Sequence, residues 1–216
     1  IACGRCVACR AGKANCCADL KVRGVHIDGG MRDTFTVPAD LLHVANQLSL
    51  EQLALIETLG IGYHAVQRSG LGRQDRAMVI GAGPIGLSVV QFAVMRCPSV
   101  TVVDVRDDRL DFCRQHFPQV RCLTADDAAM QTLTDSHHDN AVTCVFDATG
   151  HAGSMMNAFK LTPSGGRLVL VGLVQAELTF ADPDFHRKEL TVYATRNSTR
   201  KDFGEVIRLV GAGKVD

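Results

Sequence analysis

A glycine-rich turn between a strand pattern and a helix pattern constrains this 216-residue sequence more than any other feature. The turn is GAGPIG, residues 81–86, and it follows the apolar run AMVI. In a G-x-G-x-x-G turn, the first glycine permits the tight turn and the second lets backbone approach a pyrophosphate. The third lets helix and strand pack closely. The pattern is weak alone, but its place between strand and helix is the one that a dinucleotide site requires.

The sequence after the turn repeats an alternation of strand and helix patterns. Apolar runs such as SVTVVDV and AVTCVFDATG are each followed by a helical pattern. Buried strands that alternate with helices indicate a parallel sheet covered on both faces. We therefore predict an α/β fold with a Rossmann, doubly wound parallel sheet.

An acidic residue, Asp104, closes the second predicted strand, 18 residues after Gly86. A carboxylate there accepts hydrogen bonds from the adenosine ribose hydroxyls and repels a 2′-phosphate, which predicts NAD rather than NADP. Arg106 leaves NADP open, because a nearby arginine can accept that phosphate. The cofactor-binding residues predicted from the turn and the strand end are Gly81, Gly83, Pro84, Gly86 and Asp104.

Five of the nine cysteines lie within the first 17 residues. Four of them form a C-x2-C-x2-C-x7-C pattern, which is typical of a closed tetrahedral zinc site. Such a site has no open position for a substrate, so we predict a structural zinc. Cys16 is interpreted as a spectator, although its exchange with Cys17 stays open. The predicted ligands are Cys3, Cys6, Cys9 and Cys17.

Charge and composition exclude several classes of protein. The 23 basic and 23 acidic side chains balance, which argues against electrostatic binding to nucleic acid or an anionic membrane. No apolar run approaches the length of a membrane span, and no secretory signal opens the chain. A zinc-ribbon interaction protein is an alternative for the thiol pattern, but it would need a basic face and a second C-x2-C pair. Because the chain begins at Ile1 and stops within a pattern, we interpret it as a fragment.

The segment between the thiols and the glycine turn divides into two predicted parts. Residues 18–48 contain short apolar alternations and predict irregular β structure with a turn at Gly29–Gly30. Ser49 and Gln52 then form a capping-box pattern. Two helices are predicted after it, Leu50–Glu57 and Leu59–Arg68.

The order of thiol cluster, glycine turn and strand–helix alternation resembles that of the zinc-containing medium-chain alcohol dehydrogenases. The resemblance covers essentially the whole chain and is greatest to the sorbitol and threonine dehydrogenase branch. Through ATRN and DFGEVIRLVGAGKVD, the chain looks most similar to galactonate- or gulonate-type sugar-acid 5-dehydrogenases. Further matching segments are DGG at 28–30, LALIETLGIGYHAV at 53–66, DATG at 147–150 and VGL at 171–173.

The resemblance implies that the chain divides into three parts. Residues 1–50 would be part of a β-rich, GroES-like catalytic domain that carries the structural-zinc lobe. Residues 51–198 would be the Rossmann dinucleotide-binding domain. Residues 199–216 would begin the return to the catalytic domain.

The resemblance also implies a hydride transfer between NAD and a secondary alcohol of a polyol or sugar acid, with a second, catalytic zinc. Glu57 would ligate that zinc or hold its bound water. The remaining ligands would lie upstream of Ile1, so the fragment alone is expected to be inactive. A cytoplasmic homodimer or homotetramer is implied as well. A dinucleotide-binding relative without catalysis is the alternative.

The remaining site residues are also assigned by the resemblance. Arg196 and Asn197 are further candidates for contact with the substrate, since a guanidinium suits a carboxylate or several hydroxyls. Contacts with the cofactor are implied for Ile85, Arg109, Thr149, Val171, Gly172, Leu173, Thr195 and Arg196.

Overall fold

The computed structural model describes residues 1–215, which form two compact units. Unit 1 comprises residues 1–60 and the described residues from 196 onward. Unit 2 comprises Ile61–Thr195 and lies inside the segment predicted as the dinucleotide-binding domain. The division falls within helix α2, which spans Leu50–Ser69.

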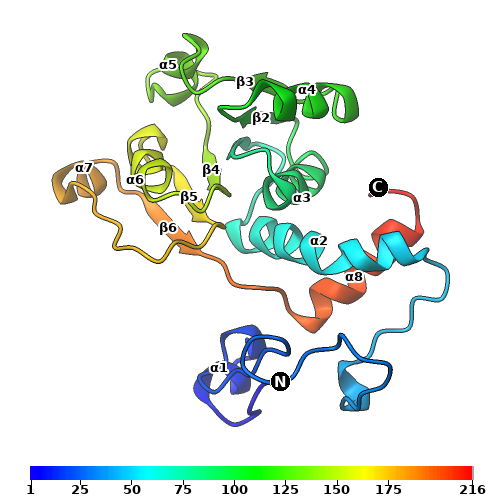
Figure 1. Cartoon of the computed structure of the whole chain (residues 1–216). Coiled ribbons are helices and arrows are strands. Elements are labelled where there is room, and N and C mark those ends of the chain that lie inside the picture. The colour runs from blue at the N-terminus through cyan, green and yellow to red at the C-terminus, as the bar shows by residue number, and fades with distance from the viewer. Residues whose placement is uncertain (216) are drawn as a thin grey trace. The chain divides into compact units, whose positions relative to one another are not determined.

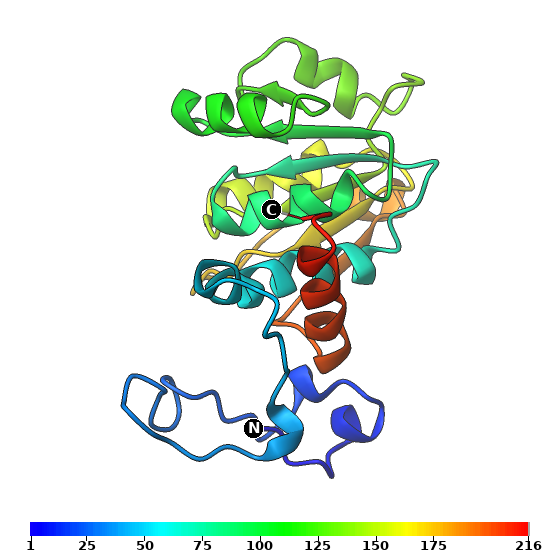
Figure 2. The ribbon, with the colours of Figure 1, turned by 90° about the vertical axis from the view of Figure 1, so that its right-hand side faces the viewer.

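Unit 2 contains a six-stranded sheet in the order β3-β2-β1-β4-β5-β6 (Figure 1). Every neighbouring pair is parallel, and Figure 2 shows the same strands from a second direction. The order reverses at β1, which pairs with β2 on one side and β4 on the other. The predicted doubly wound sheet is therefore confirmed. Its strands are β1 (Arg76–Ile80), β2 (Ser99–Val103), β3 (Arg121–Leu123), β4 (Cys144–Asp147), β5 (Arg167–Leu170) and β6 (Thr191–Ala194).

Helices cover both faces of this sheet. Figure 1 shows α3 and α4 on one side and α6 on the other. Right-handed crossovers that run from β1 to β3 in one direction along the sheet and from β4 to β6 in the other require this arrangement. Met78, Val145 and Leu168 on the central strands are fully buried between the two layers. The helices of unit 2 after the glycine turn are α3 (Pro84–Ala93), α4 (Asp107–His116), α5 (Ala129–Thr134), α6 (Ala152–Leu161) and α7 (Asp182–Arg187).

Helix α2 is one continuous helix, so the prediction of two helices with a break after Glu57 is wrong. Thr58 keeps its backbone N–H, and the helical hydrogen-bond ladder can continue through it. The predicted capping box is confirmed at the start of the helix. The backbone N–H of Ser49 donates to Gln52 Oε1 at 3.0 Å, and that of Gln52 donates to Ser49 Oγ at 3.2 Å.

Residues 18–48 contain no strand, which corrects the prediction of β structure for this segment. Their regular features are an isolated bridge between Arg23 and Ile27 and the 3₁₀ turn η2, Ala39–Leu41. A strand needs a partner for its backbone groups, and among the described residues this segment pairs with none. Its apolar side chains lie largely exposed, at 74% for Val25 and 83% for Val44.

Short helical turns and one longer helix make up the remaining regular structure of unit 1. They are α1 (Val7–Arg10), η1 (Ala14–Cys16) and α8 (Arg200–Gly211). A capping box between Thr199 and Asp202 fixes the first turn of helix α8. Within residues 1–215, no helix combines the length and the apolar character that crossing a membrane demands.

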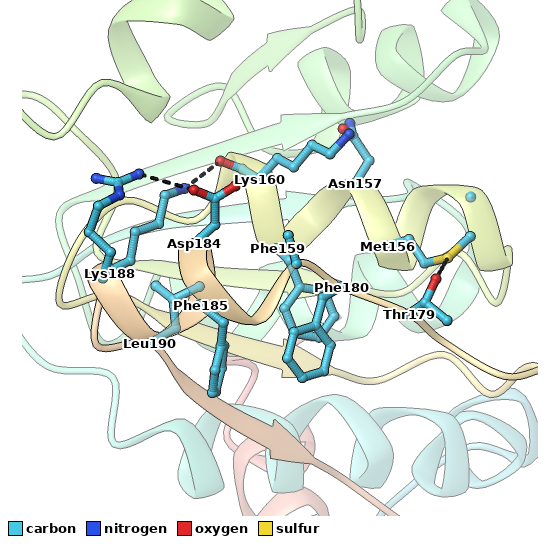
Figure 3. A pocket seen from close by; sticks show the side chains of 13 residues that line it. Met156, Asn157, Phe159, Lys160, Thr179, Phe180, Asp184, Phe185, Lys188 and Leu190 are labelled. Carbon is cyan, nitrogen blue, oxygen red and sulfur yellow. Dashed lines mark hydrogen bonds and ion pairs between the residues drawn. The ribbon is translucent and has the colours of Figure 1, made fainter.

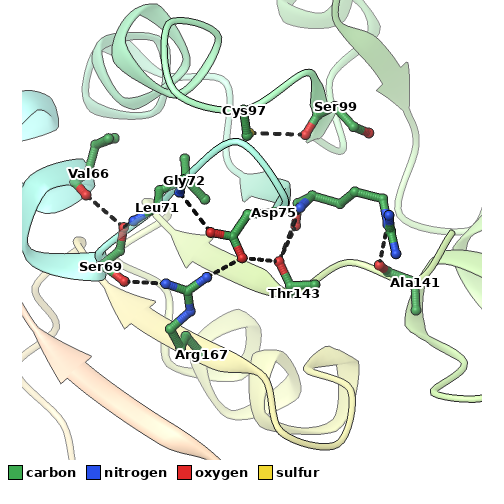
Figure 4. Close-up of polar contacts among 11 residues, drawn as sticks. Val66, Ser69, Leu71, Gly72, Asp75, Cys97, Ser99, Ala141, Thr143 and Arg167 are labelled. Carbon is green, nitrogen blue, oxygen red and sulfur yellow. Dashed lines mark hydrogen bonds and ion pairs between the residues drawn. The ribbon is translucent and has the colours of Figure 1, made fainter. Parts of the chain in front are cut away.

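A polar network joins the segments that precede β1 and β4 to Arg167, the first residue of β5 (Figure 4). Asp75 accepts hydrogen bonds from the Arg167 guanidinium, from Thr143 Oγ1 at 2.7 Å and from the Gly72 N–H at 2.8 Å. Arg167 Nη1 also donates to the Ser69 carbonyl at 2.6 Å. Burial acts to raise the pKa of Asp75, but these hydrogen bonds prevail and the pKa is lowered.

We expect Arg167→Met to lower the free energy of unfolding by about 2–4 kcal/mol, because the Asp75 carboxylate then lacks its cation in a largely buried place. The side chain of Asp75 is only 18% exposed. Urea unfolding followed by circular dichroism measures the change. The control is Arg187→Met, which breaks the exposed pair with Asp184 and should cost less than about 1 kcal/mol. Equal costs for the two variants would contradict the prediction.

The same network gives a pH dependence with a definite sign. The folded-state pKa of Asp75 lies below its unfolded value of about 4. Its contribution to stability is therefore present above that unfolded pKa, and it is lost as the pH falls through the folded pKa. Asp75→Asn should remove this part of the acid-side loss of stability.

Candidate functional site

A cavity of about 860 Å³ opens in unit 2 at the carboxyl ends of β1, β2 and β4. The strand order reverses at this place, which is where open α/β sheets bind their ligands. The structure brings together here seven residues that were predicted to bind the cofactor. They are Gly81, Gly83, Pro84, Ile85, Asp104, Arg109 and Thr149.

The glycine turn has the geometry that its spacing predicts. Gly81 has a φ of +98°, a conformation that side chains disfavour. A Cβ atom on Gly86 would lie 1.7 Å from the Gly81 carbonyl oxygen, so helix α3 packs directly against the turn. Helix α3 begins at Pro84, after the N-cap residue Gly83, and both residues line the cavity. The positive end of this helix therefore adjoins a place that suits a pyrophosphate.

Asp104 is buried, and both of its carboxylate oxygens have protein partners. Oδ2 accepts from the N–H of Ala82 in the glycine turn at 2.7 Å, and Oδ1 accepts from the N–H of Arg106 at 2.9 Å. Arg109 Nη1 lies 3.6 Å from Oδ2. A carboxylate offers about four acceptor positions, so Asp104 can hold the glycine turn and still accept bonds from ribose hydroxyls.

The turn after β4 is organised by Asp147, which is fully buried. Its Oδ1 accepts from Thr149 Oγ1 at 2.7 Å, and its Oδ2 accepts from Ser154 Oγ at 2.7 Å. Its carbonyl accepts the backbone N–H groups of Val171 and Gly172 at 2.9 and 3.0 Å. The hydroxyl proton of Thr149 is thus committed to Asp147, and its oxygen accepts the backbone N–H of His151 at 3.1 Å.

Several predicted contacts lie outside the lining of this cavity. Among the described residues, the cavity includes none of Val171, Gly172, Leu173, Thr195 and Arg196. The first three follow β5 and adjoin the turn after β4, while Thr195 follows β6 and closes unit 2. Arg196 and Asn197 belong to unit 1. The cofactor and substrate roles assigned to these residues stay predictions.

Sequence reasoning missed residues at the start of helix α6. His151 is the N-cap of that helix, accepts the N–H of Ser154 at 3.3 Å, and lines the cavity with Ser154 and Asn157. The signal was present in the sequence, because the DATG segment is followed at once by a helical pattern. The first turn of such a helix adjoins the same edge of the sheet as the strand end before it.

The thiol cluster in unit 1 has the shape of a metal site. The sulfurs of Cys3, Cys6, Cys9 and Cys17 all lie within 4.8 Å of one another. Four sulfurs around a zinc ion at about 2.3 Å stand about 3.8 Å apart, so the donor set fits zinc with a small contraction. Cys17 is buried, whereas Cys16 is exposed and lies outside the cluster.

The thiols of the cluster differ in how readily they ionise. Backbone N–H groups of Ala18 and Cys9 lower the pKa of Cys6 to about 6. Burial, with the neighbouring Cys6, raises the pKa of Cys9 to about 12. Thiols this close repel one another when all are ionised, so a divalent cation is needed for four thiolates to coexist here.

The cluster is tied to the other segment of unit 1 by a buried amide. Asn15, between the third and fourth predicted ligands, donates from Nδ2 to the Arg196 carbonyl at 2.9 Å. It is 8% exposed. The segment that follows β6 is therefore held by the thiol lobe.

Glu57 lies exposed on helix α2 and is not part of the thiol cluster. Among the described residues, the four-cysteine group is the one set of three or more His, Cys, Asp or Glu side chains close enough to hold a metal ion. The catalytic-zinc role of Glu57 stays a prediction.

A second cavity, of about 790 Å³, is lined by α6, α7 and the segment before α7 (Figure 3). Phe159 and Phe180 stack there with ring centroids 4.7 Å apart. Lys188 Nζ donates to the carbonyls of Lys160 and Thr162, both at 2.9 Å, and so satisfies the end of α6. These contacts serve the packing of α7, and we assign no ligand to this cavity.

Comparison with known proteins defines the family. The family described as zinc-binding dehydrogenase matches residues 84–212, and the chain belongs to it. L-galactonate-5-dehydrogenase of Escherichia coli (strain K12) is 37% identical over 217 residues, which cover 100% of this chain and 63% of that protein. D-xylulose reductase A of Aspergillus niger is 28% identical over 223 residues, which cover 100% of this chain and 62% of that protein.

A solved structure agrees with this membership. A short chain alcohol dehydrogenase from E. coli CFT073, complexed with cofactor NADH, superposes with a TM-score of 0.88 at 27% identity. The match covers 100% of this chain and 64% of that one. The chain thus spans a little under two thirds of the length of these relatives.

Proposed function

We propose that this chain is the dinucleotide-binding and structural-zinc part of an NAD-dependent dehydrogenase. The observation that carries the proposal is the cavity at the point where the strand order reverses, with the glycine turn at one side and Asp104 at another. Oxidised NAD would accept the hydride, and we propose that residues of this chain bind the NAD. The start of α3 suits the pyrophosphate, and Asp104 with Arg109 suits the adenosine ribose.

The proposed substrate is a secondary alcohol of a sugar acid or polyol. Support comes from the relatives, one named for L-galactonate and one for D-xylulose. We propose Glu57 as a residue of the catalytic zinc site, where a bound zinc would lower the pKa of the substrate hydroxyl. Arg196 and Asn197 are proposed to face substrate. Cytoplasmic location and assembly as a homodimer or homotetramer stay predictions of the resemblance.

The test is a titration of this chain with NADH and with NADPH, followed by the fluorescence of the reduced nicotinamide. The chain contains no tryptophan, so protein emission adds little background. We expect NADH to bind at least about tenfold more tightly than NADPH. Failure to bind either cofactor, by a chain shown to be folded, would overturn the proposed function.

Asp104→Ser separates the two tasks of that carboxylate. If Asp104 binds the ribose hydroxyls, the variant should bind NADH about tenfold more weakly, while its affinity for NADPH stays the same or rises. If Asp104 acts only through its bond to the Ala82 N–H, both affinities should fall together. The ratio of the two affinities, measured in the same titrations, decides between these results.

A further inference from the structure

An arginine stands beside the carboxylate that would select NAD. Arg106 lies two residues after Asp104, and its backbone N–H donates to the Asp104 carboxylate at 2.9 Å. Its side chain is 58% exposed. A guanidinium at this strand end is the group that would accept a 2′-phosphate. Asp104 therefore favours NAD and Arg106 favours NADP, and cofactor specificity depends on which side chain is free to act on the 2′ position.

The structure shows what the Arg106 side chain does instead. Its Nε donates to Asp108 Oδ1 at 3.0 Å, and its Nη2 donates to Asp108 Oδ2 at 2.6 Å. These two parallel bonds occupy one fork of the guanidinium, in the geometry by which arginine binds a phosphate. The hydrogen bond from Arg106 lowers the pKa of Asp108, which is therefore charged at neutral pH.

We propose that Asp108 determines cofactor specificity, because it holds and neutralises Arg106 and so withholds that cation from a 2′-phosphate. The inference rests on the proposed dinucleotide site. Asp108 touches neither the cofactor cavity nor Asp104 in this arrangement, and it acts through Arg106. With the pair intact, a 2′-phosphate meets the Asp104 carboxylate, which has Arg109 beside it, and an Arg106 whose charge is balanced by Asp108.

A contribution to folding stability does not explain the ion pair between Arg106 and Asp108. The two side chains are 58% and 64% exposed, and pairs of this kind contribute little to folding. Its effect on a bound phosphate is larger. A phosphate dianion about 6 Å from one uncompensated charge in water gains roughly fivefold to tenfold in affinity. Release of Arg106 should therefore shift cofactor choice without a measurable change in the fold.

Helix α4 supplies a matched control. Asp111 pairs with Arg114 at 2.6 Å, and both side chains are exposed, as in the first pair. This second pair lies further along the helix from Asp104 and, like Arg106 and Asp108, lies outside the lining of the cofactor cavity. Asp111→Asn removes the same unit of charge from the same helix, so it measures any general electrostatic effect.

The experiment titrates NADH and NADPH into the unaltered chain, Asp108→Asn, Arg106→Ala, the double variant and Asp111→Asn. For Asp108→Asn we expect NADPH to bind roughly fivefold to tenfold more tightly, with NADH changed less than about twofold. The gain should vanish in the double variant and shrink as salt rises from about 0.05 to 0.5 M. Asp111→Asn should leave both affinities within about twofold.

Each other result overturns the inference in a distinguishable way. If NADH binds the unaltered chain but Asp108→Asn gains nothing toward NADPH, the inference fails and the proposed function stands. A gain that survives Arg106→Ala, or that Asp111→Asn reproduces, reduces the effect to simple repulsion and also overturns it. If the folded, unaltered chain binds neither cofactor, both the inference and the proposed function fail.

Discussion

Cys17→Ser should cost the protein nearly all of its zinc, whereas Cys16→Ser should leave about one zinc per chain. The Cys17 sulfur is buried within the four-sulfur cluster, and it also accepts the backbone N–H of Cys3 at 3.1 Å. Without it the tetrahedron is incomplete, and zinc affinity should fall by at least about a hundredfold. Cys16 is exposed and outside the cluster.

The measurement is metal analysis of purified protein after competition with a chelator. The two variants change adjacent residues by the same single atom, so general effects of handling cancel. Loss of zinc from Cys16→Ser with retention in Cys17→Ser would reverse the ligand assignment. Full retention in both would remove the thiol cluster as a zinc site.

Gly86→Ala should destabilise unit 2 by about 3–5 kcal/mol and weaken NADH binding by at least about tenfold. The new Cβ would lie 1.7 Å from the Gly81 carbonyl oxygen and 2.8 Å from its carbon. Backbone atoms cannot turn aside as a flexible side chain can, so α3 must separate from the glycine turn. That movement displaces the helix start from the place proposed for the pyrophosphate.

Gly204→Ala is the matched control for this prediction. Gly204 lies within α8, and an added Cβ there meets nothing within 4 Å. Alanine should therefore stabilise that helix by about 0.5–1 kcal/mol. Urea midpoints by circular dichroism and NADH titrations compare the two variants. If Gly86→Ala changed neither the urea midpoint nor the NADH affinity, the prediction that the added Cβ clashes with the Gly81 backbone would be wrong.

The sheet could be predicted because each signal that indicates it lies within a short stretch of sequence. Strands β1, β2 and β4 come from apolar runs that are each followed by a helix, so element type and parallel pairing follow from the pattern. The glycine turn and Asp104 stand at strand ends, and the carboxyl ends of parallel strands share one edge. Their meeting in one cavity therefore follows from the topology, before any side-chain contact is known.

The features that the sequence predicted wrongly or left open in the next examples depend on how parts of the chain meet in the fold. Residues 18–48 have an alternation that suits strands, but a strand forms only where another chain segment pairs with it. The choice between Cys16 and Cys17 depends on which sulfur the turn η1, Ala14–Cys16, directs inward, and spacing alone does not fix that. The bond from Ala82 to Asp104 likewise crosses from one strand end to the next.

Unit 1 is assembled from two segments that are separated by the whole of unit 2. During synthesis residues 1–60 emerge before unit 2, and the second segment of unit 1, from residue 196 onward, follows only after residues 61–195. At about 5–20 residues per second, that interval is on the order of ten seconds. The thiol cluster needs only residues 3–17, so closing it around a metal orders a short loop at little entropic cost. Zinc capture can thus precede the bond from Asn15 to Arg196. Residues 1–60 would then stay partly ordered until the second segment of unit 1, from residue 196 onward, is synthesised.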